Sequence, residues 1–366
     1  MSKIVYPNYK NSLINVSSSL FKYYDLETTY SSLPILDKYL EKKYQHIVVF
    51  LIDAMGEEII NKHLPHHSFL KEKVISQITS VCPSTTSAAT TAFLSAKSPL
   101  QTGWFAWQQY FKKHERHIIL FLNEDYYSKE KLAVNIIKDE LPYESIFDQL
   151  AIKKPQIQAK STIFEDKKKK FLSLNKLIRF VKKEVKSKKE TFTYAYYPKL
   201  DSLMHEFGTT HKKVHKLLLK INQKLERLSK SKKDDTLVIV LADHGQIDTE
   251  KINLVHHPDF IKTLILKPSF EGRFTSFLVK DEEAFKKYFR EHFDEHFILK
   301  TKEEILNENF FGLEKKTKFE KFLGNYFLIA KGKYLLEYNV LKTPSKKSGH
   351  HAGLSRDEMN ISLIVF

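Results

Sequence analysis

Four segments of this 366-residue chain place carboxylates or imidazoles beside apolar runs of strand length. They contribute Asp53; Asp201 with His205; Asp243 with His244; and His350 with His351. Each segment alone fits a turn or a helix N-cap. Together they predict three carboxylates and at least three imidazoles at one edge of one sheet, because ligands bind beyond the carboxyl ends of strands in open α/β sheets. Mixed nitrogen and oxygen ligands of this kind suit Zn²⁺.

A fifth segment, VCPSTTSAATTAFL from Val81 to Leu94, offers hydroxyl side chains. A strand-like run leads into Pro83, and small residues and helix formers follow from Ser87. A hydroxyl at such a junction lies at a helix N-terminus, where N–H groups and the helix dipole favour a phosphate. An ordinary N-cap is the competing interpretation. As a nucleophile, a threonine would need activation by a metal ion.

The elements that must position these residues alternate between apolar runs and amphipathic segments. Predicted strands are His46–Asp53, His117–Leu122, Thr191–Tyr197 and Thr236–Asp243, and predicted helices are Ser145–Leu150, Leu172–Val185 and Lys212–Leu228. Several strands are continuously apolar, as expected for strands that are buried on both faces. The rhythm predicts an α/β fold with a largely parallel central sheet flanked by helices.

One region departs from this rhythm. Residues from about 264 to 312 predict a small α+β insertion, with strands at Arg273–Lys280 and Phe297–Lys300 and a helix at Glu282–Phe293. We expect the core to resume with Phe319–Tyr338 and to end with the strand Asn360–Phe366. The whole chain, 1–366, is therefore expected to form a single catalytic domain.

From about Gln45 to the C-terminus, the chain resembles the alkaline phosphatase superfamily, most closely its nucleotide pyrophosphatase/phosphodiesterase branch. Five motifs carry the resemblance in the right order: LIDAMG from Leu51, CPSTT from Cys82, DSLMH from Asp201, ADHG from Ala242 and GHHAGL from Gly349. As a combination they are specific, since a chance match of all five in one order is improbable.

The resemblance implies an alkaline phosphatase-like fold and two divalent metal ions, expected to be zinc. One ion would be held by Asp53, Asp243, His244 and the Thr86 hydroxyl, and the other by Asp201, His205 and His351. Thr86 is chosen as the nucleophile because the family's nucleophile stands three residues after a proline, here Pro83. His351 is preferred to His350 because the family's ligand stands directly before a pair of small residues, here Ala352-Gly353.

The implied activity is hydrolysis of phosphodiester or pyrophosphate bonds through a phospho-threonine intermediate. Ala89 stands where better-known relatives carry a phosphate-holding asparagine, so nucleotide specificity does not follow from the resemblance. No arginine lies between Gln45 and Glu115, which favours diesters over doubly charged monoesters. A lysine or Arg273 from a distant segment could still supply that charge.

Alternatives remain open at this point. A phosphomonoesterase could use the same metals. A sulfatase is disfavoured, because Cys82 is followed directly by Pro83 and no arginine comes near. The formal net charge of +16 leaves a non-enzymatic basic binding protein or an inactive scaffold as a different class, although the lysines occur in short, scattered clusters.

The cysteine content and the lengths of the apolar runs bear on the cellular location of the protein. One cysteine, Cys82, excludes a disulfide within the chain and fits a reducing compartment. The first residues lack an apolar core of signal-peptide length, and no apolar run is long enough to span a bilayer. We therefore expect a cytoplasmic protein with no membrane association. The resemblance implies a small phosphate-ester substrate, with nucleotides among the candidates, and we expect no stable nucleic-acid complex.

Overall fold

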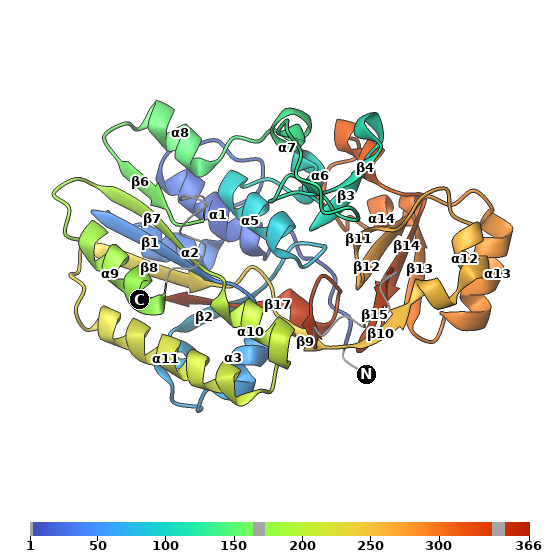
Figure 1. Ribbon diagram of the computed structural model, residues 1–366. Helices are drawn as coiled ribbons and strands as arrows, with labels where there is room; N and C mark the ends of the chain where they lie inside the picture. The colour runs from blue at the N-terminus through green and yellow to red at the C-terminus, as the bar shows by residue number, and fades with distance from the viewer. Residues whose placement is uncertain (1–2, 164–172, 339–347) are drawn as a thin grey trace.

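The computed structural model describes residues 3–163, 173–338 and 348–366. Its centre is a six-stranded sheet in the order β2-β17-β8-β1-β7-β6 (Figure 1). These strands are β1 (His46–Ile52), β2 (Val74–Thr79), β6 (Gln158–Ser161), β7 (Thr191–Tyr197), β8 (Thr236–Leu241) and β17 (Asn360–Val365). β1 pairs in parallel with β7 and β8, and β6 with β7, whereas β17 runs antiparallel to β2 and β8. The predicted α/β fold with a largely parallel sheet is confirmed.

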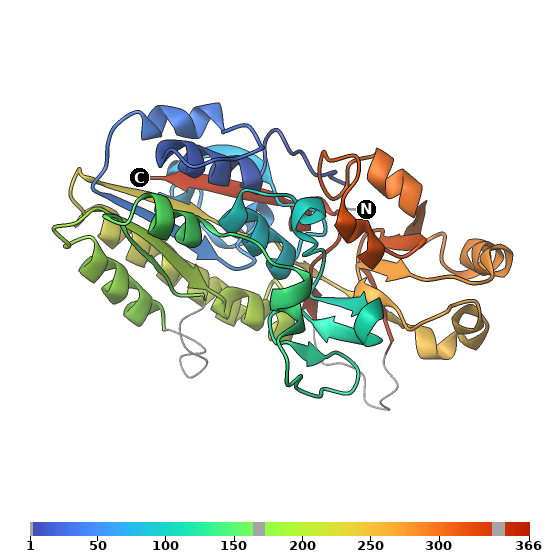
Figure 2. The same cartoon turned by 90° about the horizontal axis from the view of Figure 1, so that it is seen from above.

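Helices cover both faces of this sheet, as the view from above shows (Figure 2). One layer holds α1 (Leu13–Tyr23), α2 (Pro34–Leu40), α5 (Thr86–Ser95) and α8 (Ile146–Lys153). The other holds α3 (Glu57–His63), α9 (Leu174–Glu184), α10 (Lys199–Phe207) and α11 (Lys212–Ser229). Every residue of β1 and β8 is buried, which explains their continuously apolar sequences.

Strand direction brings the chemistry-bearing segments to one edge. β1, β7 and β8 are parallel, so their carboxyl ends share an edge. β2 ends at the same edge, because both β2 and β8 are antiparallel to the β17 strand between them. β17 begins there for the same reason, and the segment that precedes it therefore reaches this edge as well.

A second, four-stranded antiparallel sheet has the order β11-β12-β14-β13. Its strands are β11 (Ser269–Glu271), β12 (Phe274–Phe277), β13 (Phe297–Thr301) and β14 (Tyr326–Ala330), accompanied by α12 (Pro258–Lys262), α13 (Glu282–His292) and α14 (Lys302–Asn307). Phenylalanines dominate the core between this sheet and its helices, among them Phe260, Phe277 and Phe285. The elements predicted for the insertion are present.

The expected return to the core at Phe319–Tyr338 is wrong. β14 lies between β12 and β13 in the second sheet, and β15 (Tyr334–Glu337) pairs with β10 (Glu250–Asn253). The central sheet resumes only with β17. An apolar strand that is buried in either sheet has the same sequence pattern, so periodicity did not distinguish them.

The prediction of a core strand at His117–Leu122 is also corrected. Residues Arg116–Ile119 form β4, the middle of a small antiparallel sheet with β3 (Gln108–Phe111) and β5 (Glu124–Asp125). This sheet lies between the central sheet and the four-stranded sheet (Figure 1). A further short pair, β9 (Ile247–Asp248) with β16 (Gly349–His350), ties the segment after β8 to the segment before β17.

The remaining elements are short. They are α4 (Phe69–Glu72), α6 (Pro99–Thr102), α7 (Ile136–Glu140), α15 (Arg356–Met359) and the 3₁₀ helices η1 (Lys112–His114), η2 (Leu254–His256) and η3 (Lys318–Phe322). None of the helices in the described ranges is long and apolar enough to cross a membrane.

Candidate active site

The predicted residues converge on two neighbouring groups at the shared strand edge. Asp53 follows β1 directly, and Asp243 and His244 follow β8. These three residues form the first group, with candidate ligand atoms within 4.8 Å of one another. His244 Nε2 lies 3.6 Å from Asp53 Oδ1 and 3.6 Å from Asp243 Oδ2.

The second group consists of Asp201, His205 and His351. Asp201 and His205 lie one turn apart on α10, which follows β7, and His351 follows β16. Asp201 Oδ1 is 3.2 Å from His205 Nε2 and 3.9 Å from His351 Nε2. The groups adjoin, since the rings of His244 and His351 stack with centroids 3.9 Å apart. His350 lines the neighbouring pocket but belongs to neither group.

Thr86 is the first residue of α5, as the helix-start prediction required. Its Oγ1 lies 3.1 Å from His244 Nε2, so it faces the first group. The side chain of the N-cap residue, Thr85, accepts no hydrogen bond from the described N–H groups that open α5. Those N–H groups and the helix dipole favour an anion beside Thr86.

The three histidines share one arrangement that prepares them as ligands. Nδ1 of His205, His244 and His351 lies 2.6, 2.8 and 3.2 Å from a backbone carbonyl oxygen, of Gly349, Gly245 and Ser84 respectively. A carbonyl only accepts, so each Nδ1 carries a proton, and in the neutral imidazole Nε2 is the nitrogen whose lone pair is left for a metal ion. Protein zinc sites commonly fix their histidines in this way.

A cation would resolve contacts that the protein alone leaves unfavourable. A neutral His205 with its proton on Nδ1 would present an acceptor, Nε2, to the acceptor Asp201 Oδ1 at 3.2 Å. Asp53 Oδ1 and Asp243 Oδ2 are buried and accept no hydrogen bond from any described residue. Tetrahedral zinc, with ligand bonds of about 2.1 Å, would separate its ligands by roughly 3.4 Å, close to the spacings in both groups. The donor set therefore fits two divalent ions.

Buried carboxylates dominate the electrostatics of the first group. Burial raises the pKa of Asp53 well above its ordinary value, and repulsion from Asp243 and Asp201 adds to this shift. The Tyr196 hydroxyl donates a hydrogen bond to Asp53 Oδ2 and opposes the shift. Tyr196 was not identified from the sequence, because an aromatic residue on a buried strand is typical of a core.

A pocket of about 1210 Å³ opens beside the two groups. Thr86, Asp201, His205 and His351 line one part of it, and aromatic residues, including Trp107, Tyr126, Tyr127 and Tyr338, line the rest. Trp104, by contrast, is buried in the core and donates through Nε1 to the Leu141 carbonyl oxygen. The pocket is large enough for a ligand well beyond the size of a phosphate group.

Glu271, at the end of β11, is a further acidic residue at this site. Its Oε1 accepts a hydrogen bond of 2.6 Å from the Trp107 backbone N–H, and its Oε2 lies 3.8 Å from His351 Nδ1. Burial raises its pKa, whereas the Trp107 N–H and the nearby imidazoles of His244 and His205 oppose the increase. The sequence offered no signal for it, because one glutamate in a strand-to-turn segment carries no spacing information.

Arg273 does not reach the site as the sequence allowed. Its side chain is fully buried and forms a bidentate ion pair with Glu358, through Nε at 2.6 Å and Nη2 at 2.7 Å. Among the described residues that line the pocket, Lys129 is the single lysine and there is no arginine.

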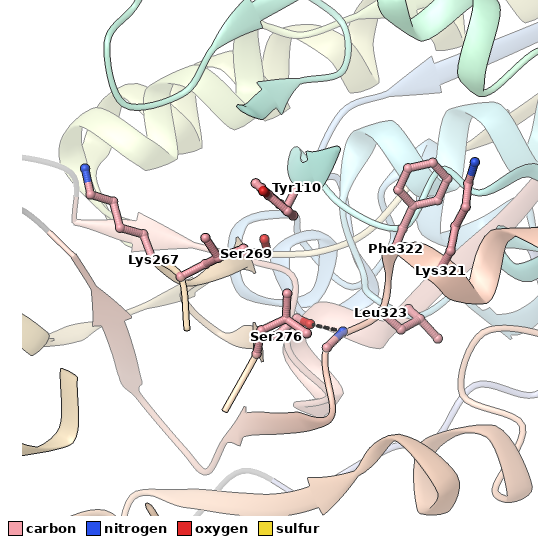
Figure 3. A pocket seen from close by; sticks show the side chains of 10 residues that line it. Tyr110, Lys267, Ser269, Ser276, Lys321, Phe322 and Leu323 are labelled. Carbon is pink, nitrogen blue, oxygen red and sulfur yellow. Dashed lines mark hydrogen bonds between the residues drawn. The ribbon is translucent and has the colours of Figure 1, made fainter. Parts of the chain in front are cut away.

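Figure 3 shows a second cavity, whose described lining includes no residue of either group. It measures about 20 Å³ and is lined by Tyr110, Ser269, Ser276 and neighbouring residues. Ser276 Oγ already accepts a hydrogen bond of 2.9 Å from the Gly324 N–H. The cavity has room for a single water molecule, so the large pocket is the candidate substrate site.

Comparison with known proteins identifies the family. The family model described as type I phosphodiesterase / nucleotide pyrophosphatase matches residues 47–353. The fold is similar to that of inactive murine ectonucleotide pyrophosphatase/phosphodiesterase 5 in complex with AMP (TM-score 0.67, 13% identity, 88% of this chain and 87% of that chain). The human protein gives a TM-score of 0.64 at 15% identity, covering 87% of each chain.

A bacterial structure is also similar. Phosphonoacetate hydrolase from Sinorhizobium meliloti, in complex with phosphonoformate, gives a TM-score of 0.62 at 13% identity, covering 87% of this chain and 89% of that chain. No curated protein sequence matches this chain. The family match spans both groups of site residues and most of the chain, and it follows that this protein belongs to the type I phosphodiesterase / nucleotide pyrophosphatase family of hydrolases.

Proposed function

We propose that the chain hydrolyses phosphodiester or pyrophosphate bonds through a covalent phospho-threonine intermediate on Thr86. The observation that carries the proposal is the position of the Thr86 hydroxyl. It opens α5 and lies 3.1 Å from His244 Nε2, beside two groups of carboxylates and imidazoles.

Asp53, Asp243, His244 and Thr86 would hold one divalent ion, and Asp201, His205 and His351 the other. Zinc is the proposed metal because both groups combine nitrogen and oxygen ligands. When bound, such ions would neutralise charge on the phosphoryl oxygens and lower the pKa of the threonine hydroxyl.

The residues of the chain account for the remaining steps. Oγ1 of Thr86 attacks phosphorus, and the bond from phosphorus to the leaving oxygen breaks. The N–H groups that open α5 stabilise charge on the phosphoryl group. The threonine proton passes to the leaving oxygen. Water then cleaves the phospho-threonine: its oxygen bonds to phosphorus, the bond from phosphorus to Oγ1 breaks, and a proton from the water restores the Thr86 hydroxyl as the phosphate product leaves.

Diesters are the proposed substrate class. A diester carries one charge fewer than a monoester, and the pocket provides no arginine among its described lining residues. A nucleotide-like leaving group is supported by the aromatic lining and by the AMP bound to the murine protein. A phosphomonoesterase remains the second candidate, since Lys129 lines the same pocket.

The test combines hydrolysis with metal analysis. Bis-p-nitrophenyl phosphate, p-nitrophenyl phosphate and nucleotide substrates are compared under one buffer and metal condition. Thr86→Ala should reduce kcat by orders of magnitude and leave the fold intact. Ser84→Ala and Thr85→Ala should be far milder, although the Ser84 hydroxyl donates to the Gly353 carbonyl oxygen at 2.7 Å. If Ser84→Ala alone abolishes turnover, Thr86 is not the nucleophile.

A further inference from the structure

Glu271 belongs to the four-stranded sheet, but its side chain lies beside the second candidate metal group. It ends β11 in that sheet, yet its carboxylate lies 3.8 Å from the His351 imidazole and lines the pocket with Thr86. Its side chain is 16% exposed, and the Trp107 N–H holds one carboxylate oxygen in place. The other oxygen lies on the Nδ1 side of His351, and Glu271 lines the same pocket as Thr86, so this carboxylate is fixed in the wall of the pocket that holds the candidate nucleophile.

A charge count shows what this carboxylate changes. With two divalent ions bound, Asp53, Asp201 and Asp243 would carry three negative charges against four positive ones. Glu271 brings the total to zero, whereas the same site without it would keep one positive charge. Among the described residues of the pocket wall, Lys129 is the only lysine or arginine that could offset the negative charge of Glu271. Arg273 is already paired with Glu358.

We propose that Glu271 is a specificity-determining residue that disfavours doubly charged phosphate monoesters relative to singly charged diesters. The inference rests on the proposed function of the site. The physical reason is that a negatively charged carboxylate, fixed in the wall of the pocket that holds Thr86, repels each further negative charge on the substrate. Because the Glu271 side chain is only 16% exposed, water screens this repulsion less than it would at the protein surface.

The decisive variant is Glu271→Gln, which keeps the shape of the side chain and a carbonyl oxygen for the Trp107 N–H. We measure kcat/KM for p-nitrophenyl phosphate and for bis-p-nitrophenyl phosphate in one buffer with one metal. The monoester-to-diester ratio should rise about tenfold or more relative to the unmodified protein. Metal content, measured by mass spectrometry, should stay unchanged.

A binding experiment tests the same idea without turnover. Isothermal titration with sulfate, a dianion, and with dimethyl phosphate, a monoanion, reports charge selection by the metal-loaded protein. Glu271→Gln should strengthen sulfate binding by about tenfold and change dimethyl phosphate binding much less. Glu271→Ala provides a second variant with the same expected direction.

Glu337→Gln is the comparison variant, because Glu337 lies on β15 and also lines the pocket. If Glu337→Gln raises the monoester-to-diester ratio as much as Glu271→Gln does, the effect comes from the total negative charge of the pocket wall and not from Glu271. The inference is then overturned. Loss of metal in Glu271→Gln would overturn it as well, because the residue would then support the metal groups. An unchanged ratio and unchanged sulfate affinity would do the same.

Failure of the inference is distinguishable from failure of the proposed function. If the unmodified protein hydrolyses the diester but Glu271→Gln leaves charge selection unchanged, only the inference fails. If the unmodified protein hydrolyses neither ester, the proposed function fails, and the sulfate and dimethyl phosphate titrations still decide whether Glu271 selects charge.

Discussion

At the scale of single residues, backbone carbonyls decide which nitrogen each site histidine presents. His351 Nδ1 faces the Ser84 carbonyl oxygen and leaves Nε2 for Asp201, whereas His350 lies outside both candidate groups. We therefore expect His351→Ala to lose metal from the second group and His350→Ala to keep it. Metal per chain, measured by mass spectrometry after dialysis, checks this. Equal metal loss in both variants would count against the choice of His351.

Tyr196 gives a second prediction at this scale. Its hydroxyl donates a hydrogen bond to Asp53 Oδ2, and carboxylate ligands are commonly oriented by such donors. Tyr196→Phe should weaken metal affinity by about 10–100-fold, measured by competition with a chelator. Tyr194→Phe is the matched control on the same strand, since the Tyr194 hydroxyl is buried and bonds to no described residue. Equal weakening by both variants would rule out a role for the Tyr196 hydrogen bond.

At the scale of elements, close approach of loops holds the first group together. A Cβ at Gly245 would lie 1.9 Å from the Asp357 carbonyl oxygen and 3.3 Å from Gly56 Cα. Only a residue without a side chain allows the loop after β8 to pass between these neighbours. The glycine of the ADHG motif therefore has a packing role, directly beside the candidate ligands Asp243 and His244.

Gly245→Ala should displace this loop. We expect the free energy of unfolding to fall by about 1–3 kcal/mol or more, together with loss of metal from the first group. Gly332→Ala is the control, because its Cβ would meet no atom within 4 Å, although its φ of +56° should cost about 1 kcal/mol. Thermal unfolding and metal analysis of both variants provide the test. A Gly245→Ala protein with unchanged metal content would show that the loop tolerates the added methyl group.

The sequence was informative about elements where one local pattern has one structural explanation. Continuous apolar runs identified β1, β7 and β8, and the residues that end them fall where parallel strands must deliver them. Patterns that fit two environments misled. The apolar stretches at β4 and β14 were buried, as predicted, but in other sheets.

The sequence could not identify residues whose role depends only on contacts with distant parts of the chain. Glu271 approaches His351 from a different sheet, and no spacing along the chain encodes that contact. Arg273 could be recognised as a rare arginine, but not as one committed to Glu358. The nucleophile, the choice of metals, the cytoplasmic location and the single-domain organisation stay predictions.

At the scale of the whole molecule, a buried ion pair links the two main sheets. Arg273 lies between β11 and β12 of the four-stranded sheet, and Glu358 lies on α15, directly before β17 of the central sheet. Both side chains are fully buried. Arg273 also donates to the carbonyl oxygens of Gly332 and Tyr334, and Glu358 accepts from the Gly353 N–H, two residues from His351. The pair therefore couples packing between the sheets to the segment that carries His351.

Removal of the Arg273 side chain should destabilise the fold, because it leaves the buried Glu358 carboxylate without its counter-charge. We expect Arg273→Met to lower the free energy of unfolding by about 3–5 kcal/mol at neutral pH. Arg273→Met combined with Glu358→Gln should recover part of this loss, since no uncompensated charge then remains. Urea unfolding of the three proteins, in the presence of a chelator so that metal does not contribute, measures the difference. A double variant no more stable than Arg273→Met would contradict this explanation.

The same pair predicts how stability depends on pH. Burial alone would raise the pKa of Glu358, but Arg273, the Ser355 hydroxyl and the Gly353 N–H together hold it below its ordinary value of about 4.3. A carboxyl group whose pKa is lower in the folded than in the unfolded protein stabilises the fold above the unfolded pKa. That contribution is lost as the pH falls through the folded pKa. In Arg273→Met the counter-charge is gone and only the Ser355 hydroxyl and the Gly353 N–H oppose burial. We expect burial to outweigh them and the sign to reverse, so stability should fall as the pH rises from about 4 toward 7. The stability gap between the unmodified protein and Arg273→Met should therefore widen from acid to neutral pH in urea unfolding series. A gap that stays constant over this range would show that Arg273 acts through packing, not through the charge of Glu358.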